Sequence, residues 1–219
     1  MKKILVAACS ATVFLFACNS GEKDKVVATD TKMEAIKKDS PATAAPAPLM
    51  DSAAMMKAWS EFKTPGPMHK WLASQTGTWE GEVSQWMDAS APPTKSKTTI
   101  VNTMTFNGLF QQSRFMGSMM GMPFEGHSIT GYDNGKKMFV STWIDNSSSG
   151  MVYMTGNWDE GTKTFSLKGK QTDPMTGKDC DIREELKVID DNTQTMTMYG
   201  TGMDGKEMKF MEGTFTRKK

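Results

Sequence analysis

The chain has 219 residues, with 26 basic and 25 acidic side chains, two histidines and three cysteines, and a formal net charge of +1 at pH 7. This near-neutral balance gives no electrostatic reason to expect a nucleic-acid partner. Two histidines and so few cysteines leave little material for a zinc site or a catalytic triad. The length suits one domain with a tail.

The N-terminus has the layout of a secretory signal peptide. Two lysines precede an apolar run over residues 4–16, and the small residue Ala17 stands before Cys18. The apolar run is too short to cross a bilayer, because a membrane-spanning helix needs about 20 such residues. Residues 15–18 resemble the lipobox of bacterial lipoproteins.

The resemblance implies that Cys18 becomes the first mature residue and carries lipid, palmitate among the acyl chains. Asn19 follows it, and by resemblance to the sorting rule of enteric bacteria an Asn here favours the outer membrane. We therefore expect a lipid-anchored protein of the cell envelope, at the outer membrane. The alternative is an ordinary secreted protein whose cysteine lies near the cleavage site by coincidence.

The composition divides the chain into three parts. Residues 1–17 form the signal peptide, and residues 18–50 form the lipidated cysteine with an Ala- and Pro-rich linker that lacks apolar periodicity. Residues 51–219 form the folded domain. Once Cys9 is removed and Cys18 is acylated, only Cys180 remains, so an intramolecular disulfide is excluded.

One or two short helices are expected at the start of this domain. Asp51 can cap a helix that runs to Phe62, in which Met55, Met56 and Trp59 fall at helical spacing. A Pro-Gly-Pro sequence at 65–67 ends that helix. A second helix is predicted over residues 68–74, with its apolar side chains facing the core.

From residue 78 onward the apolar residues recur with a period of two, which is typical of strands. The runs that fit this pattern are 78–87, 97–106, 110–119, 124–132, 137–144, 151–158, 164–171, 181–189, 193–199 and 207–217. Short turns that begin with Asp separate the later runs, for example Asp133–Gly135, and leave no room for helices between them. The sequence thus predicts an all-β fold: an antiparallel meander of about ten strands closed into a barrel.

Several longer motifs resemble a bacterial family known as domain of unknown function 1579. They are Thr76–Gly81, Gly121–Asn134, Val140–Asn146 and Thr172–Lys178. The resemblance extends over roughly residues 68–218 and implies a calycin-like barrel with no established activity. Gly77 and Trp79 also form the Gly-x-Trp pattern of lipocalins.

The favoured hypothesis is a non-catalytic barrel that binds a small apolar ligand, without a cofactor. An eight-stranded barrel is filled by its own side chains or holds one small ligand, and more strands leave more room. The abundant aromatic and methionine residues suit such an interior. The candidate ligand-binding residues are Trp79, Arg114, Met120, Met122, Phe124, His127, Trp143 and Trp158. The alternative is that the same apolar side chains form a packed core.

Three other functions remain open at this point. Met116, Met119, Met120 and Met122 offer thioethers that suit Cu(I). Heme needs a single axial histidine, for which His127 is the candidate because His69 is expected in a loop. The domain could also be a protein-interaction scaffold at the cell envelope, through its exposed strands or its first helix.

Enzymatic activity is not expected. Glu80 and Glu82 share one strand face and are most simply exposed to solvent, while Glu184 and Glu185 point to opposite faces of their strand. The Asp residues of the turns are explained by turn formation. His127 and Ser128 are neighbours in sequence, so a strand places them on opposite sides.

Overall fold

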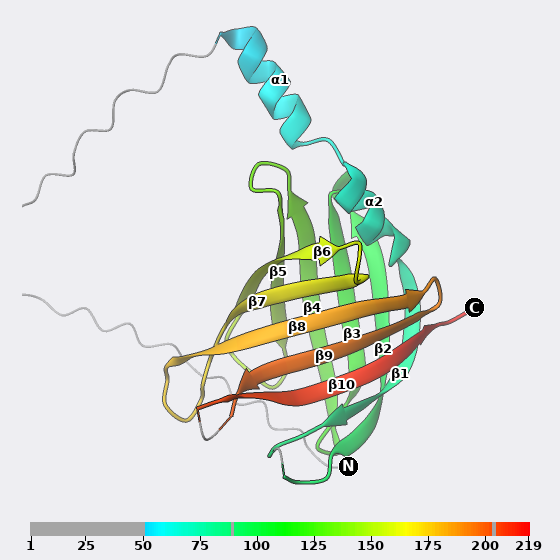
Figure 1. The fold of residues 1–219 in the computed structure, drawn as a ribbon, viewed down its shortest axis with the longest axis vertical. Coiled ribbons are helices and arrows are strands. Elements are labelled where there is room, and N and C mark those ends of the chain that lie inside the picture. The colour runs from blue at the N-terminus through cyan, green and yellow to red at the C-terminus, as the bar shows by residue number, and fades with distance from the viewer. Residues whose placement is uncertain (1–50, 89, 203–204) are drawn as a thin grey trace, which may run out of the picture. The chain divides into compact units, whose positions relative to one another are not determined.

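A computed structural model describes residues 51–88, 90–202 and 205–219. The predicted signal peptide, the predicted lipidation site Cys18 and the predicted linker lie outside the described residues. Within the described part, two helices precede ten strands that form one closed barrel (Figure 1).

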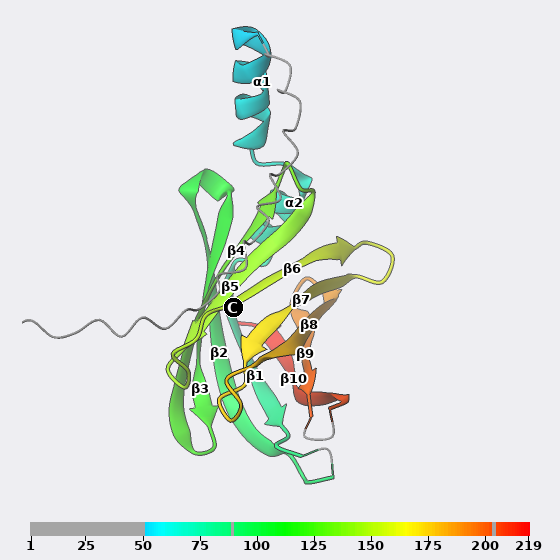
Figure 2. The same cartoon turned by 90° about the vertical axis from the view of Figure 1, so that its left-hand side faces the viewer.

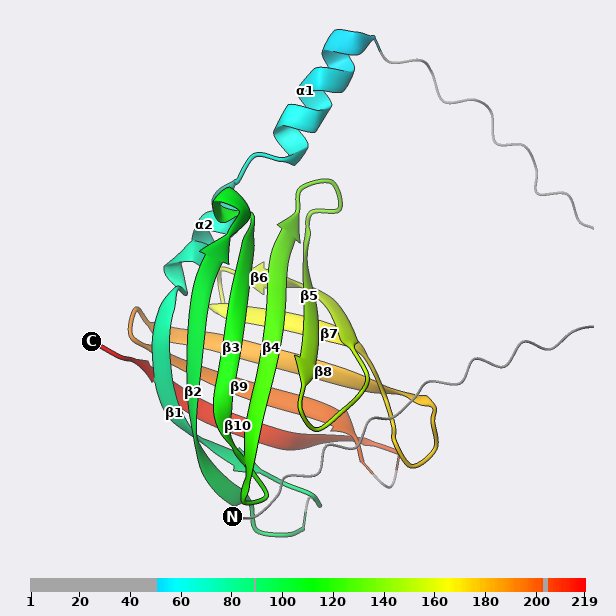
Figure 3. The same ribbon diagram turned by 180° about the vertical axis from the view of Figure 1, so that it is seen from behind.

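Every strand pairs antiparallel with the strand before and after it, and β1 pairs with β10 to close the barrel. The prediction of an all-β meander of ten strands closed into a barrel is confirmed. Figure 3 shows β1 to β5 as one wall, and Figure 1 shows β6 to β10 as the other. The strands are β1 (Gly77–Gln85), β2 (Thr94–Thr105), β3 (Phe110–Met119), β4 (Met122–Asp133), β5 (Met138–Asp145), β6 (Val152–Asp159), β7 (Thr164–Thr172), β8 (Asp179–Asp190), β9 (Thr193–Thr201) and β10 (Glu207–Arg217).

Aspartates form the turns between strands, as the sequence indicates. The Asp133 carboxylate accepts hydrogen bonds from the backbone N–H groups of Gly135 and Lys136, at 2.8 and 2.9 Å. These backbone N–H groups bond to a side chain instead of to a neighbouring strand, so the strand ends here. The same arrangement, one Asp oxygen bonded to a backbone N–H two or three residues later, occurs at Asp145, Asp159, Asp173 and Asp190.

Helix α2 (Pro67–Ser74) closes one end of the barrel. Its Leu72 is buried in the core, and the Leu72 carbonyl accepts a hydrogen bond from Gln111 Nε2 at 2.7 Å. Asn102 Nδ2 donates to the carbonyl of Gln75, which caps the helix, at 3.0 Å. Two interior amides thus satisfy carbonyls that the end of a helix leaves unpaired. The C-terminal end of α2 is therefore joined to the barrel wall by hydrogen bonds as well as by apolar contacts.

His69 lies in α2 and is buried. This agrees with the helix predicted over residues 68–74, and the separate expectation of a loop position for His69 was wrong. Its Nδ1 accepts a hydrogen bond from the backbone N–H of Gly66 at 3.0 Å. This contact stabilises the first turn of the helix, whose leading N–H groups have no partner within the helix. Burial lowers the pKa of His69, so the neutral ring is favoured. The presence of a buried histidine at position 69 is thus explained by its contact with the first turn of α2.

Helix α1 (Ser52–Phe62) begins as predicted, because the Asp51 carboxylate accepts a hydrogen bond from the Ala54 N–H at 2.7 Å. Its apolar residues do not enter the core: Met55, Met56, Trp59 and Phe62 are all exposed. The end of α1 is held by the turn between β4 and β5, where Asn134 Nδ2 donates to the carbonyls of Phe62 and Thr64 at 2.9 Å. Figure 2 shows α1 standing away from the strands. Among the described residues, no helix is both long and apolar enough to cross a bilayer.

The buried apolar side chains form two groups. One centres on Phe139 and lies against α2, and it contains Leu72, Phe165 and Leu167. The other contains Trp79, Val83, Ile100, Met196 and Phe215, beside the seam between β1 and β10. Arg217 covers the second group: its guanidinium lies 4.2 Å from the centre of the Trp79 ring and donates to the carbonyl of Ser74 at 2.8 Å.

Candidate ligand-binding cavity

The barrel is not filled by its side chains, because it encloses a cavity of about 350 Å³. Trp71, Leu72 and Gln75 line it at the end closed by α2. At the other end the lining reaches the last residues of β3 and the β5–β6 loop, including Met151. Pockets of about 300–1,000 Å³ are typical of small-molecule sites. The volume is therefore adequate for a small ligand.

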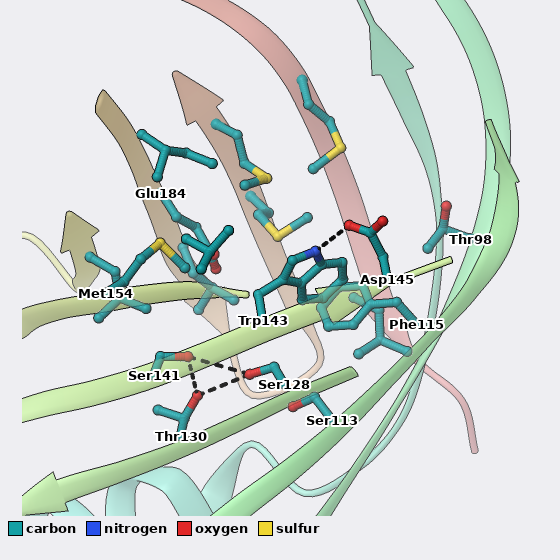
Figure 4. A pocket seen from close by; sticks show the side chains of 18 of the residues that line it. Thr98, Ser113, Phe115, Ser128, Thr130, Ser141, Trp143, Asp145, Met154 and Glu184 are labelled. Atoms are coloured by element: carbon teal, nitrogen blue, oxygen red, sulfur yellow. Dashed lines mark hydrogen bonds between the residues drawn. The ribbon is translucent and has the colours of Figure 1, made fainter. Parts of the chain in front are cut away.

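Trp143 on β5 is the centre of an aromatic group on the cavity wall (Figure 4). Phe115 meets the indole edge to face at 5.0 Å between ring centroids, and Phe124 stacks on it at 6.3 Å. Gly126 has no side chain, and a Cβ there would stand 2.3 Å from the Trp143 ring. The indole can therefore lie directly against β4. Its Nε1 donates to Asp145 Oδ2 at 2.7 Å, which fixes its orientation.

Hydroxyl groups line the cavity on β4 and β5. Ser128, Thr130 and Ser141 are buried and bond to one another, with Thr130 Oγ1 and Ser141 Oγ 2.9 Å apart (Figure 4). Ser128 Oγ lies 3.2 Å from Thr130 Oγ1 and 3.4 Å from Ser141 Oγ. Each hydroxyl can donate and accept, so the group can also bond a polar atom of a ligand.

The opposite wall, on β6 to β9, is mainly apolar, and its polar side chains are those of Gln171, Thr172, Glu184 and Gln194. Met154, Leu167 and Ile182 are buried there and line the cavity. Glu184 on β8 projects into the same space (Figure 4). Within the described residues it makes no hydrogen bond or ion pair, and desolvation raises the pKa of its carboxyl to about 7. A carboxyl with a strongly raised pKa inside a cavity is a frequent mark of a functional site.

Two of the residues predicted to bind ligand line the cavity: Phe124 and Trp143. Trp79 is buried in the core beside Phe215, and its Nε1 donates to the Gln75 carbonyl at 3.0 Å. Trp158 packs against Trp71, with 4.7 Å between ring centroids, and is absent from the cavity wall. For these two tryptophans the structure shows packing roles.

Arg114 and His127 lie on the outer face of the barrel. Arg114 Nε donates to Glu125 Oε1 at 2.8 Å, and His127 Nε2 lies 2.9 Å from the same oxygen. Two hydrogen bonds hold the pKa of Glu125 below its usual value, and the bond from Arg114 contributes more than the bond from His127. A group bound inside the barrel would not reach the His127 ring, so the structure offers no support for it as an axial heme ligand.

The methionine-rich segment forms the end of β3 and the turn to β4. Met119 lines the cavity, whereas Met120 and Met122 are exposed. The thioethers are thus divided between the cavity and the surface, which is unfavourable for one Cu(I) site. Among the side chains of residues 51–88, 90–202 and 205–219, no cluster of three or more His, Cys, Asp or Glu could hold a metal ion.

Sequence reasoning missed the polar part of the cavity wall and the role of Glu184. On β4 the expected pattern is reversed: Ile129 is 51% exposed, while Ser128 and Thr130 are 9% and 6% exposed. The position of Glu184 between Ile182 and Leu186 at a spacing of two was a usable signal, because these three side chains share one face. The hydroxyls carried no such signal, since alternating Ser and Thr is also typical of an exposed face.

Comparison with known proteins supports the fold and identifies the family. A search of the curated proteins finds no match. Among solved structures, that of Rv2717c from M. tuberculosis is similar with a TM-score of 0.56 and 11% identity, over 71% of this chain and 100% of that one. A redesigned β-barrel has a TM-score of 0.36 at 13% identity, over 68% of this chain and 95% of that one. A protein of unknown function from the DUF3598 family of Nostoc punctiforme has a TM-score of 0.36 at 12% identity, over 67% of this chain and 49% of that one.

At 11% identity, the likeness to Rv2717c shows a shared fold alone. The family is shown by the sequence instead. The family described as protein of unknown function DUF1579 matches residues 64–217, which include α2 and all ten strands. The chain therefore belongs to the DUF1579 family.

Proposed function

We propose that this protein binds a small, largely apolar molecule inside a calycin-like barrel and does not catalyse a reaction. The observation that carries the proposal is the cavity of about 350 Å³, with an aromatic group around Trp143 and a mainly apolar wall on β6 to β9. Burial of apolar surface contributes about 25 cal/mol per Å², so such a wall favours an apolar ligand. A few polar groups in a mainly apolar pocket would set the orientation of that ligand.

The cavity wall gives little support for catalysis. Neither histidine lines it, and the hydroxyls of Ser128, Thr130 and Ser141 bond to one another rather than to a base. Asp145 bonds to the Trp143 indole and to Ser147, whose N–H and Oγ donate to Asp145 Oδ1 at 2.8 and 2.6 Å. Of the two carboxyl groups in the cavity wall, Asp145 is therefore held by hydrogen bonds from Trp143 and Ser147, and Glu184 has no such partner in the described part of the chain.

Replacing Trp143 by alanine is expected to weaken binding of 1-decanol at least tenfold. The indole supplies the largest aromatic surface in the group with Phe115 and Phe124, and an aromatic side chain can bury about 150–250 Å². Calorimetric titration of the purified protein with 1-decanol measures this, and native mass spectrometry detects molecules that the protein already carries.

The matched control is Trp59→Ala, because Trp59 is a tryptophan on the exposed face of α1. It should bind 1-decanol as the unchanged protein does, and thermal unfolding would confirm that both variants are folded. If the unchanged protein binds neither 1-decanol nor any molecule from its host, ligand binding in the cavity is refuted.

We also propose that the domain is held at the cell envelope, at the outer membrane, by lipid on Cys18. The support is the segment of residues 1–18 alone, with its lysines, short apolar run and lipobox-like end. Cys18→Ala should abolish palmitate labelling and move the protein from the membrane fraction to the soluble fraction. Cys180→Ala is the control and should leave both unchanged, whereas membrane association that survives Cys18→Ala would contradict the proposal.

The exposed apolar face of α1 favours a second function, that of a protein-interaction scaffold. Met56 and Trp59 are 70% and 63% exposed on a helix that is anchored to the barrel by Asn134. Exposed apolar surface of this kind often marks an interaction site. A barrel that binds no probe in the titration above would favour this function over ligand binding.

A further inference from the structure

The cavity has an acidic interior. Of the residues that line it, only Asp145 and Glu184 carry ionisable carboxyl groups, and none of the lining residues is lysine, arginine or histidine. Asp145 has hydrogen-bond donors on both of its oxygens, from Trp143 and Ser147. Glu184 has none in the described part of the chain. A ligand would therefore meet one carboxyl group that still lacks a partner.

Every element packed beside Glu184 presents an apolar side chain to it. Leu167 is its paired residue on β7 and Met198 its paired residue on β9, while Ile182 and Leu186 flank it on its own strand. An ionised carboxylate in such surroundings is costly unless an opposite charge or hydrogen-bond donors accompany it. The protein supplies neither from these neighbours.

Two cations beside Glu184, Arg183 on its own strand and Lys168 on the paired strand β7, are directed away from the cavity. Arg183, on the outer face of β8, bonds to Glu207 through Nε at 3.0 Å and Nη2 at 2.9 Å, and it also bonds to Glu185. Lys168 follows Leu167 on β7 and therefore points to the opposite side of the strand. Arg183 is thus paired with glutamates of the outer face, and the interior carboxyl of Glu184 takes no part in these ion pairs.

The aromatic rings of the cavity suit a positive charge as well. Trp143, Phe115 and Phe124 all line it, and the face of an aromatic ring attracts ammonium groups. Hydroxyls of Ser128, Thr130 and Ser141 can accept hydrogen bonds from an ammonium N–H. The Glu184 carboxyl and the aromatic rings therefore favour a cation over an anion, and the hydroxyls can accept the hydrogen bonds that its N–H groups donate.

We infer that the ligand of this barrel is a cationic amphiphile, whose ammonium group pairs with the Glu184 carboxylate while its apolar body lies along the β6–β9 wall. The inference rests on the proposed function, since it names the chemical class that the same cavity accepts. It explains why a mainly apolar wall contains a single carboxyl without a partner.

The test compares three probes of equal chain length, decylamine, 1-decanol and decanoic acid, by calorimetric titration of the purified protein at pH 8. A primary amine with a pKa of about 10 is protonated there. Decylamine should bind at least tenfold more tightly than 1-decanol, and decanoic acid should bind most weakly. Lowering the pH to 5 should remove most of the preference for decylamine, because protonation of Glu184 abolishes its charge.

Glu184→Gln keeps the shape of the side chain and removes its charge. It should weaken decylamine binding at least tenfold at pH 8 and change 1-decanol binding less than twofold. The matched control is Glu82→Gln, which removes one charge from the outer face of β1, where Glu82 pairs with Lys95. That control should leave all three affinities unchanged.

The outcomes separate the inference from the proposed function. If 1-decanol binds and decylamine binds no better, or if Glu184→Gln does not affect decylamine, the cationic class is refuted while ligand binding stands. Tighter binding of decanoic acid than of decylamine would likewise overturn it. If none of the three probes binds and the protein carries no molecule from its host, the proposed function fails together with the inference.

Discussion

Replacing Phe139 by alanine is expected to lower the free energy of unfolding by about 4 kcal/mol, in the range measured for large-to-small changes of buried aromatic residues. Phe139 is 0% exposed and lies at the centre of the core group beside α2. Its ring meets those of Trp71, Tyr132 and Phe165 at centroid distances of 5.5, 5.0 and 4.9 Å. These neighbours come from α2, β4 and β7, so alanine leaves a void that no single movement can fill.

Urea unfolding of the purified variant measures the effect as a lower midpoint at an unchanged slope. The matched control is Phe106→Ala, because Phe106 is 75% exposed in the turn before β3. A surface change of this kind should alter stability by less than about 0.5 kcal/mol. Similar losses for the two variants would show that Phe139 does not occupy the core position assigned to it.

Replacing Glu184 by glutamine is expected to raise the free energy of unfolding at pH 8 by about 4 kcal/mol, because a pKa difference of one unit corresponds to about 1.4 kcal/mol. A glutamate in an unfolded chain has a pKa of about 4.3, whereas desolvation in the barrel raises the pKa of Glu184 to about 7. Between these pH values the folded state keeps a proton that the unfolded state has lost. The stability of the unchanged protein therefore falls as pH rises from about 4 to 7.

Glutamine cannot ionise, so the variant lacks this dependence and the two proteins should be about equally stable near pH 4. The measurement is urea unfolding of both proteins at pH 4, 6 and 8, without added ligand. Glu82→Gln, on the outer face, should change stability by less than about 1 kcal/mol at each pH. A difference between Glu184→Gln and the unchanged protein that stays constant with pH would mean that Glu184 is not desolvated in the folded state.

Glu184→Gln is thus expected to raise stability and to weaken decylamine binding, and both effects have the same cause, the loss of an unpaired carboxylate. An unpaired carboxylate inside the barrel destabilises the empty protein, and a ligand with an ammonium group would compensate for it. Natural proteins often retain such local instability where a binding site needs it. A variant that is more stable and binds decylamine less well would show this relation in one molecule.

The order and direction of the strands were predictable from the sequence. Each run with a period of two is followed by a short turn, and turns such as Asp133–Gly135 join only antiparallel neighbours. The predicted bounds of β3 and β10 coincide with those observed, Phe110–Met119 and Glu207–Arg217. These features are local, since a few residues and their own backbone determine a turn and the strand that it ends.

The positions of individual side chains were less predictable. Met120 and Met122 seemed suited to an apolar interior but lie exposed at a turn, where Gly121 has a φ of +80°. Trp79 and Trp158 were assigned to a ligand and belong to packed groups instead. Residue type indicates that an aromatic side chain will be buried, but it does not say whether it will pack against the core or face a cavity.

The sequence by itself determined ten antiparallel strands, an inward-facing second helix and the turns that join them, because periodicity and turn chemistry act over a few residues. Only the tertiary structure decided what the barrel encloses. A period of two separates the two faces of a strand without saying which is inside, and the choice is made when β1 pairs with β10 and ten faces meet. That closure places Ser128, Thr130 and Glu184 around a cavity and leaves Ile129 in solvent.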